Sequence, residues 1–412
     1  MQAKTFTKNT SFFGKAFFFK ERFVLKEKNI RFFDKIFFHK ESFPSSFGKA
    51  FLLKKRFVLK EKIINNFYRT TAIFNKPMTR LMVPHPGHFS ALKEIIEAKE
   101  SEEGLEEVEE VFMGGSPEVM GSGRGVLHAP LIDEIREQTE YAHQHGIKMN
   151  IVMNSTCLGG HHLTFEGYKM FKWYFRELDK AGVDGVIVAE PYLVELLRDF
   201  PMKTIVSVLS YVDAPQRAKF FEDLGADVIT VDTNINRHFP LLRAIVKAVN
   251  CDVRVIVNEG CLYRCPFRYF HYNLASHLSS LNQPRSPLFA TDFYFDKCIN
   301  IRLRNPTQII KSPWIRPEDV KEYEAIGIKS FKLSGRTKTV NWIIECMKAY
   351  SHRSFKGNLL ELLDCPQMLR FVFYVDNEKL EGSIDQWKNC KKICNECGYC
   401  DKLTQEVLTC IK

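Results

Sequence analysis

The sequence predicts an α/β fold, a closed (β/α)8 barrel of the TIM type, from about Met78 to His352. Eight short apolar segments recur after residue 80, most of them are followed by a segment with helical periodicity, and together they span about 250 residues. Strands that alternate with helices form right-handed βαβ units in a parallel sheet, and eight such units have the size of a closed barrel.

The eight predicted strands are short apolar runs that end in polar or glycine-rich residues. They cover residues 81–84, 108–113, 148–153, 183–189, 203–209, 226–231, 253–258 and 328–333. Two of the intervening segments, 128–145 and 165–181, have apolar residues at three- and four-residue spacing, as amphipathic helices do. Each is followed by a glycine, Gly146 or Gly182, that can end a helix. The competing architecture is an open doubly wound sheet, but no Gly-x-Gly-x-x-Gly follows the first strand.

Positive charge is concentrated before the barrel. Residues 1–80 hold 19 of the 59 Lys and Arg residues but only 5 of the 49 Asp and Glu, so their net charge is +14 and residues 81–412 carry −4. The barrel therefore lacks the overall basic surface of many nucleic-acid-binding proteins, and any contact with RNA must be local.

The basic N-terminal extension, residues 1–77, contains a repeat. Residues 13–30 recur as residues 47–64 with 14 of 18 positions identical, and 17 of the 35 Phe residues fall within residues 1–80. Two copies are too few for a solenoid. We expect this extension to be disordered and non-catalytic, a translated upstream repeat with Met78 as the natural first residue. The alternative is an amphipathic basic segment that binds an anionic membrane or nucleic acid.

The cysteines indicate metal binding in the cytoplasm. No run of 18 apolar residues or secretory signal pattern occurs, so we expect no membrane span. Twelve cysteines lie after the extension, several of them in close groups. Clustered cysteines without a secretory signal are more typical of metal ligands in a reducing compartment than of disulfides.

Polar residues follow the predicted strands at the end where barrel enzymes have their active sites. Among them we expect three proton carriers, Glu259, Glu190 and His85. We expect the substrate to be bound by Asn154, Asn258, Arg124 and Arg336, with the two arginines holding an anionic group or, alternatively, forming ordinary ion pairs.

Two groups of cysteines are candidate metal ligands. Cys261 and Cys265 follow the seventh strand, and Cys298 lies in the long segment before the eighth. The C-terminal segment, residues 353–412, contains Cys390, Cys394, Cys397 and Cys400 within eleven residues. Soft thiolate ligands select an iron-sulfur cluster or zinc, and at the C-terminal group zinc stays open as the alternative. The isolated cysteines, expected to be core thiols, are Cys251, Cys346, Cys365 and Cys410.

These residues resemble the collagenase-like peptidase U-32 family, which includes RNA-base and oxygen-independent ubiquinone hydroxylation proteins. The resemblance rests on the pair Cys261 and Cys265, on Cys298, and on Ile328–Arg336, which looks like the family's segment at the end of the barrel. It implies a 4Fe-4S cluster held by four cysteines near the barrel mouth. The fourth cysteine that some members have near Pro317 is missing here. Cys157, a cysteine of the C-terminal group or an open iron site are the candidates for that position.

The resemblance implies an iron-sulfur enzyme, a hydroxylase or oxidoreductase with one or two 4Fe-4S clusters. Its substrate would be an RNA base, a quinone precursor or another small aromatic molecule, and a paralogous family member or an electron donor would be its partner. Two alternatives stay open, a peptidase and a non-catalytic iron-sulfur scaffold or electron carrier. The sequence has no Gly-x-Ser-x-Gly or His-Glu-x-x-His motif to favour a peptidase, and only Cys157 near His161 and His162 suggests a nucleophile and its base.

Overall fold

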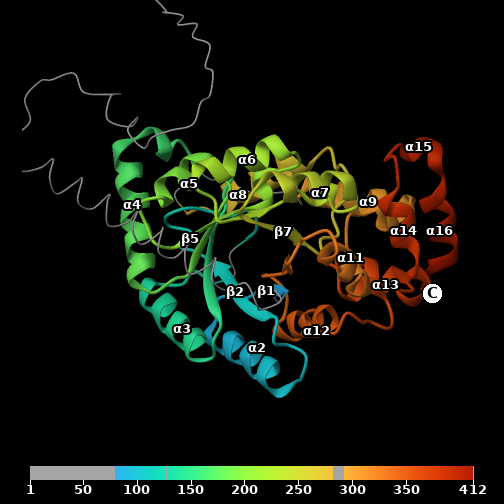
Figure 1. The fold of residues 1–412 in the computed structure, drawn as a ribbon, viewed down its shortest axis with the longest axis horizontal. Helices are drawn as coiled ribbons and strands as arrows, with labels where there is room; N and C mark the ends of the chain where they lie inside the picture. Colours follow the sequence, from blue (N-terminus) through green and yellow to red (C-terminus); the bar gives the residue numbers. More distant parts are fainter. Residues whose placement is uncertain (1–78, 126–127, 282–291, 412) are drawn as a thin grey trace, which may run out of the picture. The chain divides into compact units, whose positions relative to one another are not determined.

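The computed structural model describes residues 79–125, 128–281 and 292–411. Within these ranges eight parallel strands close into a barrel in sequence order, and β1 pairs with both β2 and β8 (Figure 1). The predicted barrel is confirmed, and so is each of its eight predicted strands, within a few residues at either end. The basic extension, residues 1–77, and Met78 lie outside the described residues. The strands are β1 (Arg80–Pro84), β2 (Val108–Gly114), β3 (Lys148–Met153), β4 (Gly185–Val188), β5 (Lys203–Val206), β6 (Val228–Thr230), β7 (Asp252–Ile256) and β8 (Ser330–Lys332).

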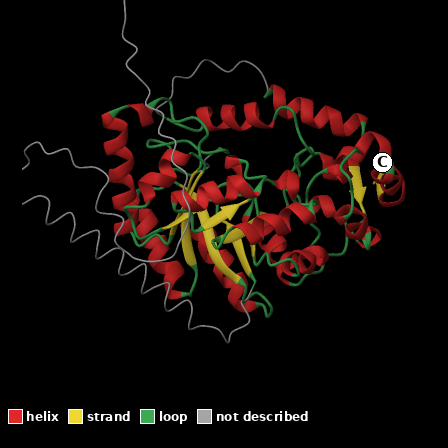
Figure 2. Cartoon of the chain, turned by 45° about the horizontal axis from the view of Figure 1, so that its top comes forward, coloured by secondary structure: helices red, strands yellow, loops and turns green. Residues whose placement is uncertain are grey.

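Helices surround the barrel, as Figure 2 shows with the strands at the centre. Gly146 and Gly182, at φ +69° and +78°, follow α3 and α4 in the left-handed conformation that the sequence predicts. Helix α3 begins at Ile132, later than residue 128, because Pro130 disfavours helical backbone before it. The helices that follow β1 to β6 and β8 are α2 (Phe89–Ser101), α3 (Ile132–Gln144), α4 (Phe165–Lys180), α5 (Pro191–Leu197), α6 (Pro215–Leu224), α7 (Phe239–Ala248) and α12 (Val340–Ser351).

Side chains fill the barrel interior in layers, as in other barrels of eight strands. One apolar layer consists of Met82, Phe112, Val152, Ile187, Ile205 and Val228. A polar layer adjoins it, in which Arg254 of β7 donates to both carboxylate oxygens of Glu110 in β2 at 2.9 Å. Asn150 and Ser330 complete this layer through hydrogen bonds to Glu110 and Arg254. The opposite faces of the strands contribute to the larger apolar core beneath the helices.

Replacing Gly185 with alanine should destabilise the protein by about 1–3 kcal/mol, because the interior has no room for another methyl group. A Cβ at this position would lie 2.4 Å from Oδ1 of Asn150, the side chain that donates to Glu110. Urea unfolding measures the change. Gly125→Ala is the control, since a Cβ there meets nothing within 4 Å. Equal stability of the two variants would contradict this close packing.

The segment between β7 and β8 is unusually long, and its described residues carry four α-helices. They are α8 (Arg268–Leu278), α9 (Phe293–Arg304), α10 (Thr307–Lys311) and α11 (Val320–Glu324). Segments of this kind at the carboxyl end of a barrel strand build the active sites of barrel enzymes.

The C-terminal segment packs against the barrel through α16 and α10. Trp387 of the segment and Trp314 of the barrel meet edge to face at 5.3 Å, and the Arg237 guanidinium lies 3.6 Å from one ring centre and 4.4 Å from the other. The elements of this segment are α13 (Leu369–Val372), α14 (Ser383–Lys388), α15 (Cys394–Cys397), α16 (Tyr399–Val407) and the antiparallel strands β9 (Phe373–Val375) and β10 (Leu408–Cys410).

Among the described residues, none of the helices combines the length and the apolar composition needed to cross a membrane.

Candidate functional site

A cavity of about 530 Å³ lies at the carboxyl end of the barrel strands, and four cysteines line it. Its walls come from the loops after β2, β7 and β8, from α8 and α9, and from the beginning of the C-terminal segment. Three of its thiols are the predicted ligands Cys261, Cys265 and Cys298, and the fourth is Cys365. We refer to it as the cysteine cavity.

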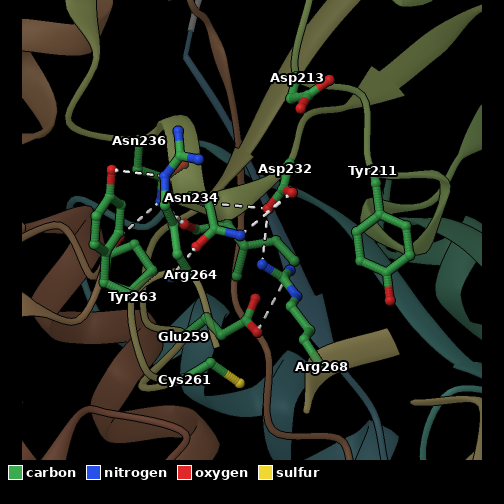
Figure 3. Close-up of polar contacts among 12 residues, drawn as sticks. Tyr211, Asp213, Asp232, Asn234, Asn236, Glu259, Cys261, Tyr263, Arg264 and Arg268 are labelled. Atoms are coloured by element: carbon green, nitrogen blue, oxygen red, sulfur yellow. Dashed lines mark hydrogen bonds and ion pairs between the residues drawn. The ribbon is translucent and has the colours of Figure 1, made fainter. Parts of the chain in front are cut away.

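Glu259 and Arg268 form a buried polar network beside Cys261 (Figure 3). Arg268 donates to Asp232 at 2.7 Å, and its second amino group lies 3.8 Å from Glu259. The Tyr272 hydroxyl donates to Glu259 at 3.0 Å and lies 3.8 Å from the Cys261 sulfur. Burial alone would raise the pKa of Glu259, but the Arg268 guanidinium holds it below its ordinary value. Glu259 is therefore an anion beside the cysteine cavity.

The loop 261–265 directs two thiols into the cysteine cavity. Arg264 has a φ of +48°, and its amide donates to the Asn234 side chain at 2.8 Å, which holds the loop against the loop after β6. Cys261 and Cys265 line the cysteine cavity, whereas Tyr263 between them lines a different, smaller cavity. Proline at position 266, with its fixed φ, limits helical continuation directly after the loop.

Arg302 holds Cys298 at the cavity wall. This arginine is 1% exposed, and it donates to the Cys298 sulfur at 3.1 Å and to the carbonyl of Gly260. It forms no ion pair with a carboxylate of the described residues. Its positive charge is thus available to thiolates in the cavity.

Cys365, which the sequence suggests to be a core thiol, lies in the cavity wall. Asp364 pairs with Glu259 in an isolated β-bridge, and the Gly260 amide donates to the Asp364 carbonyl at 3.3 Å. A Cβ on Gly260 would come within 2.6 Å of the Cys365 Cβ, so glycine allows this close approach. Burial raises the pKa of the Cys365 thiol to about 11. No local pattern around residue 365 signals this position, because a pairing across more than a hundred residues creates it.

None of the three predicted proton carriers lines the cysteine cavity, and Glu259 lines a neighbouring cavity deeper in the barrel mouth. His85 is fully buried against Gln138 of α3, at 2.6 Å, and burial lowers its pKa to about 4. The Glu190 carboxylate accepts from the Tyr192 amide at 2.7 Å and caps α5. Of the three predicted carriers, only Glu259 lies beside the cysteines.

The two predicted asparagines fix loops at the barrel mouth. Asn258 accepts from the Ser334 amide at 2.8 Å and donates to the carbonyls of Ser334 and Leu362, so it joins the loop after β7 to the one after β8. Asn154 donates to Ser207 at 2.9 Å and accepts from the Gly123 amide at 3.1 Å. Asn154 also lines this second cavity deeper in the barrel mouth, to which we refer as the deeper cavity.

The two predicted arginines differ in their partners. Arg124 forms an ion pair with Asp364 at 2.8 Å. Arg336 donates to the Ser122 hydroxyl and, at 3.3 Å, to the Arg124 carbonyl, which are neutral groups. Both arginines line the deeper cavity, which shares Arg124 and Tyr272 with the cysteine cavity.

Three of the four C-terminal cysteines gather at the other side of the loop 261–265. Cys390, Cys394 and Cys400 line the small cavity that Tyr263 also lines, together with the cations Arg237, Lys311 and Lys392. The Lys392 amide donates to the Cys390 sulfur at 3.3 Å, and Lys392 has a φ of +65°. Cys397 is exposed, three residues after Cys394 in α15.

In the ranges that the structure describes, no three Cys, His, Asp or Glu side chains already converge on one point as ligands of a metal ion. The hydrogen bonds of these residues do not join Cys157 to His161 or His162 either; the Cys157 carbonyl and amide bond to Ser155. The cysteines of the cysteine cavity, and those of the small cavity that Tyr263 lines, instead lie around open space.

Comparison with known proteins identifies relatives of this chain. Residues 97–262 match the model of peptidase family U32. A curated protein of Methanocaldococcus jannaschii, named uncharacterized protease MJ1657, is 39% identical over 331 residues, which cover 79% of this chain and 98% of that protein. The solved structure of the U32 peptidase Mk0906 is 26% identical and covers 63% of this chain and 94% of that one, with a TM-score of 0.46.

Proposed function

This chain belongs to peptidase family U32, and from that premise we propose that it is an iron-sulfur enzyme whose cysteine cavity holds a 4Fe-4S cluster. Its reaction would be an oxygen-independent hydroxylation, or a related modification, of an RNA base, a quinone precursor or another small aromatic molecule. One observation carries the proposal: four thiols from three separate segments line one cavity at the barrel mouth.

The donor set fits such a cluster. Thiolates are the ligands that iron-sulfur clusters require, one for each iron. A cluster of four irons needs these ligands spread around its own volume, and thiols on the walls of one cavity satisfy that need better than thiols at one point. Arg302 and Lys338 line the same cavity and would balance part of the negative charge of four thiolates. Cys365 supplies the fourth ligand in this proposal.

The remaining residues of the site would bind the substrate and carry protons. The deeper cavity opens beside Tyr272 and Arg124, which also line the cysteine cavity, so a substrate there would lie next to the cluster. Tyr272 and Glu259 share a hydrogen bond, through which a proton can move between a substrate and the buried carboxylate. Arg268 keeps Glu259 ionised and oriented. Hydroxylation with oxygen from water would remove two electrons from the substrate, and the cluster, when bound, would supply the electron transfer that this requires.

In the proposal the C-terminal cysteines hold a second metal centre, either a 4Fe-4S cluster or zinc. The amide donation from Lys392 to the Cys390 sulfur and the nearby cations would favour thiolates there. A cytoplasmic electron donor or a paralogous family member would be the partner.

Peptidase activity is the second candidate, because the relative from M. jannaschii is named a protease. A cysteine peptidase needs a thiol activated by a neighbouring base. Within the described residues no histidine lines the small C-terminal cavity, and the cysteine cavity has His271, which pairs with Asp292 at 3.0 Å. A histidine held by a carboxylate is the arrangement that orients a catalytic base, but among the described residues no hydrogen bond joins His271 to a cysteine of this cavity, so the four thiols remain the observation that favours a cluster.

Anaerobic purification followed by iron, sulfide and zinc analysis tests the proposed function. We expect about four iron and four sulfide atoms for the cysteine cavity, with a broad absorbance near roughly 400 nm, and a further increment of iron or zinc for the C-terminal group. A chain that contains no iron after anaerobic purification and reconstitution, and that cleaves a protein substrate, would instead be a peptidase.

A further inference from the structure

The deeper cavity at the barrel mouth contains a buried lysine that has no acidic partner among the described residues. Lys332 is the last residue of β8, it is 8% exposed, and it lines this cavity of about 70 Å³. Its ammonium lies 3.9 Å from the centre of the Phe112 ring. Among the described residues this ammonium forms no hydrogen bond and no ion pair.

Arg336 is a second basic side chain in the same cavity, and it too forms no ion pair with a carboxylate of the described residues. It is 6% exposed, its side-chain hydrogen bonds within the described part of the chain go to neutral oxygens of Ser122 and Arg124, and its Nε has no partner there. Gly335, at a φ of +121°, allows the turn that brings Arg336 over the barrel. A Cβ on Gly335 would also lie only 2.2 Å from the Trp342 ring.

The carboxylates around these two cations already have partners. Glu110, below Lys332, accepts from Arg254 through both oxygens. Asp364 pairs with Arg124 at 2.8 Å, and Glu259 accepts from Tyr272.

The cavity is therefore left with two basic side chains that no carboxylate of the described residues neutralises. Burial, together with Arg254 and Arg336, holds the pKa of Lys332 well below its ordinary value, and burial lowers that of Arg336 to about 10. Burial without a counter-ion disfavours the charged form of a lysine, and an anion in the cavity would stabilise the charged form of both side chains.

We propose that Lys332 and Arg336 bind the oxyanion group of the substrate, a carboxylate or a phosphate. A cavity of about 70 Å³ has room for such a group but not for a whole substrate, whose body would extend past Arg124 and Tyr272 into the cysteine cavity. Loops after the last strands of barrel enzymes often bind phosphate in this place. The inference names the anionic part of the substrate of the proposed function, but it rests on residues outside both cysteine groups.

Calorimetric titration of the anaerobically purified full chain with inorganic phosphate and with benzoate tests the site, and the two probes distinguish phosphate from carboxylate. We expect one of them to bind at millimolar concentration, and Lys332→Met and Arg336→Met each to weaken that binding about tenfold or more. Lys329→Met is the matched control, because Lys329 lies just before the same strand, at the opposite end of the barrel. Unchanged binding in the Lys332→Met protein, or no binding of either probe to the unmodified chain, would overturn the proposal.

Thermal melting separates a binding role from a structural one. Without added anion, Lys332→Met should melt at the same temperature as the unmodified chain or higher, because the variant removes a buried basic group that has no counter-ion. A large fall in melting temperature would show that Lys332 stabilises the barrel, and that would also overturn the proposal. Iron content is measured in the same samples. A chain without iron that still binds the anion through Lys332 would refute the cluster and retain the anion site.

Discussion

Replacing Cys365 with serine should remove most of the iron and the absorbance near roughly 400 nm from the cysteine cavity, and with it the activity. Serine keeps the size of the side chain but replaces the soft sulfur ligand that iron-sulfur clusters need. The loss should equal that of Cys261→Ser, because both residues line the same cavity. Iron and sulfide analysis of the anaerobically purified proteins measures it.

Cys251→Ser is the matched control for this experiment. Cys251 directly precedes β7, at the end of the barrel opposite the cysteine cavity, and it is half-buried like Cys365. We expect the Cys251→Ser protein to contain as much iron as the unmodified chain. If Cys365→Ser retained its cluster while Cys261→Ser lost it, the fourth ligand would be another residue.

Replacing Glu110 with glutamine should lower the free energy of unfolding by about 3–5 kcal/mol, the largest stability effect that we expect for a single side chain. The side chains of Glu110 and Arg254 are only 6% and 1% exposed, so the variant leaves a buried guanidinium without its counter-charge. Urea unfolding near neutral pH measures the change.

The same variant should show a smaller pH dependence at the acid end. Burial alone would raise the pKa of Glu110, but Arg254 holds it below its ordinary value of 4.5. A carboxyl with a lowered pKa stabilises the folded state above its unfolded pKa, and that contribution is lost as the pH falls through the folded pKa. The stability difference between the two proteins should therefore narrow below about pH 4.

Asp199→Asn is the control for the buried pair. Lys172 and Asp199 form an ion pair at 2.5 Å, but the Asp199 side chain is 72% exposed. Exposed pairs contribute about 1 kcal/mol or less, so this variant should be nearly as stable as the unmodified chain. If Glu110→Gln and Asp199→Asn lowered the free energy of unfolding by similar amounts, the Glu110 and Arg254 pair would not be buried as the structure implies.

The barrel could be predicted from the sequence because its signal is local. Each strand is a short apolar run, and the order of strands and helices determines which ends of the strands meet. The same logic placed Glu259, Cys261 and Cys265 at the barrel mouth, since they directly follow β7.

Other parts of the site depend on contacts that no local pattern reveals. Cys365 reaches the cavity because its segment pairs with the end of β7. His85 and Glu190 also follow strands, but the His85 ring forms a hydrogen bond with Gln138 of α3, and the Glu190 carboxylate accepts from an amide in the first turn of α5. Position after a strand therefore identifies candidates, and the partner of each side chain decides which of them face the cavity.

The contact of Arg237 with both Trp314 and Trp387 has a consequence for how this chain could have evolved. Trp314 is 1% exposed, and Trp387 of the C-terminal segment is one of the side chains that cover it. A relative without that segment would present an indole and a guanidinium to water on the side of its barrel, which favours small polar residues at both positions. We expect homologues either to have Trp314, Arg237 and the segment with the four cysteines together, or to lack all of them. A tryptophan at the position of Trp314 would then indicate that a homologue also has this segment.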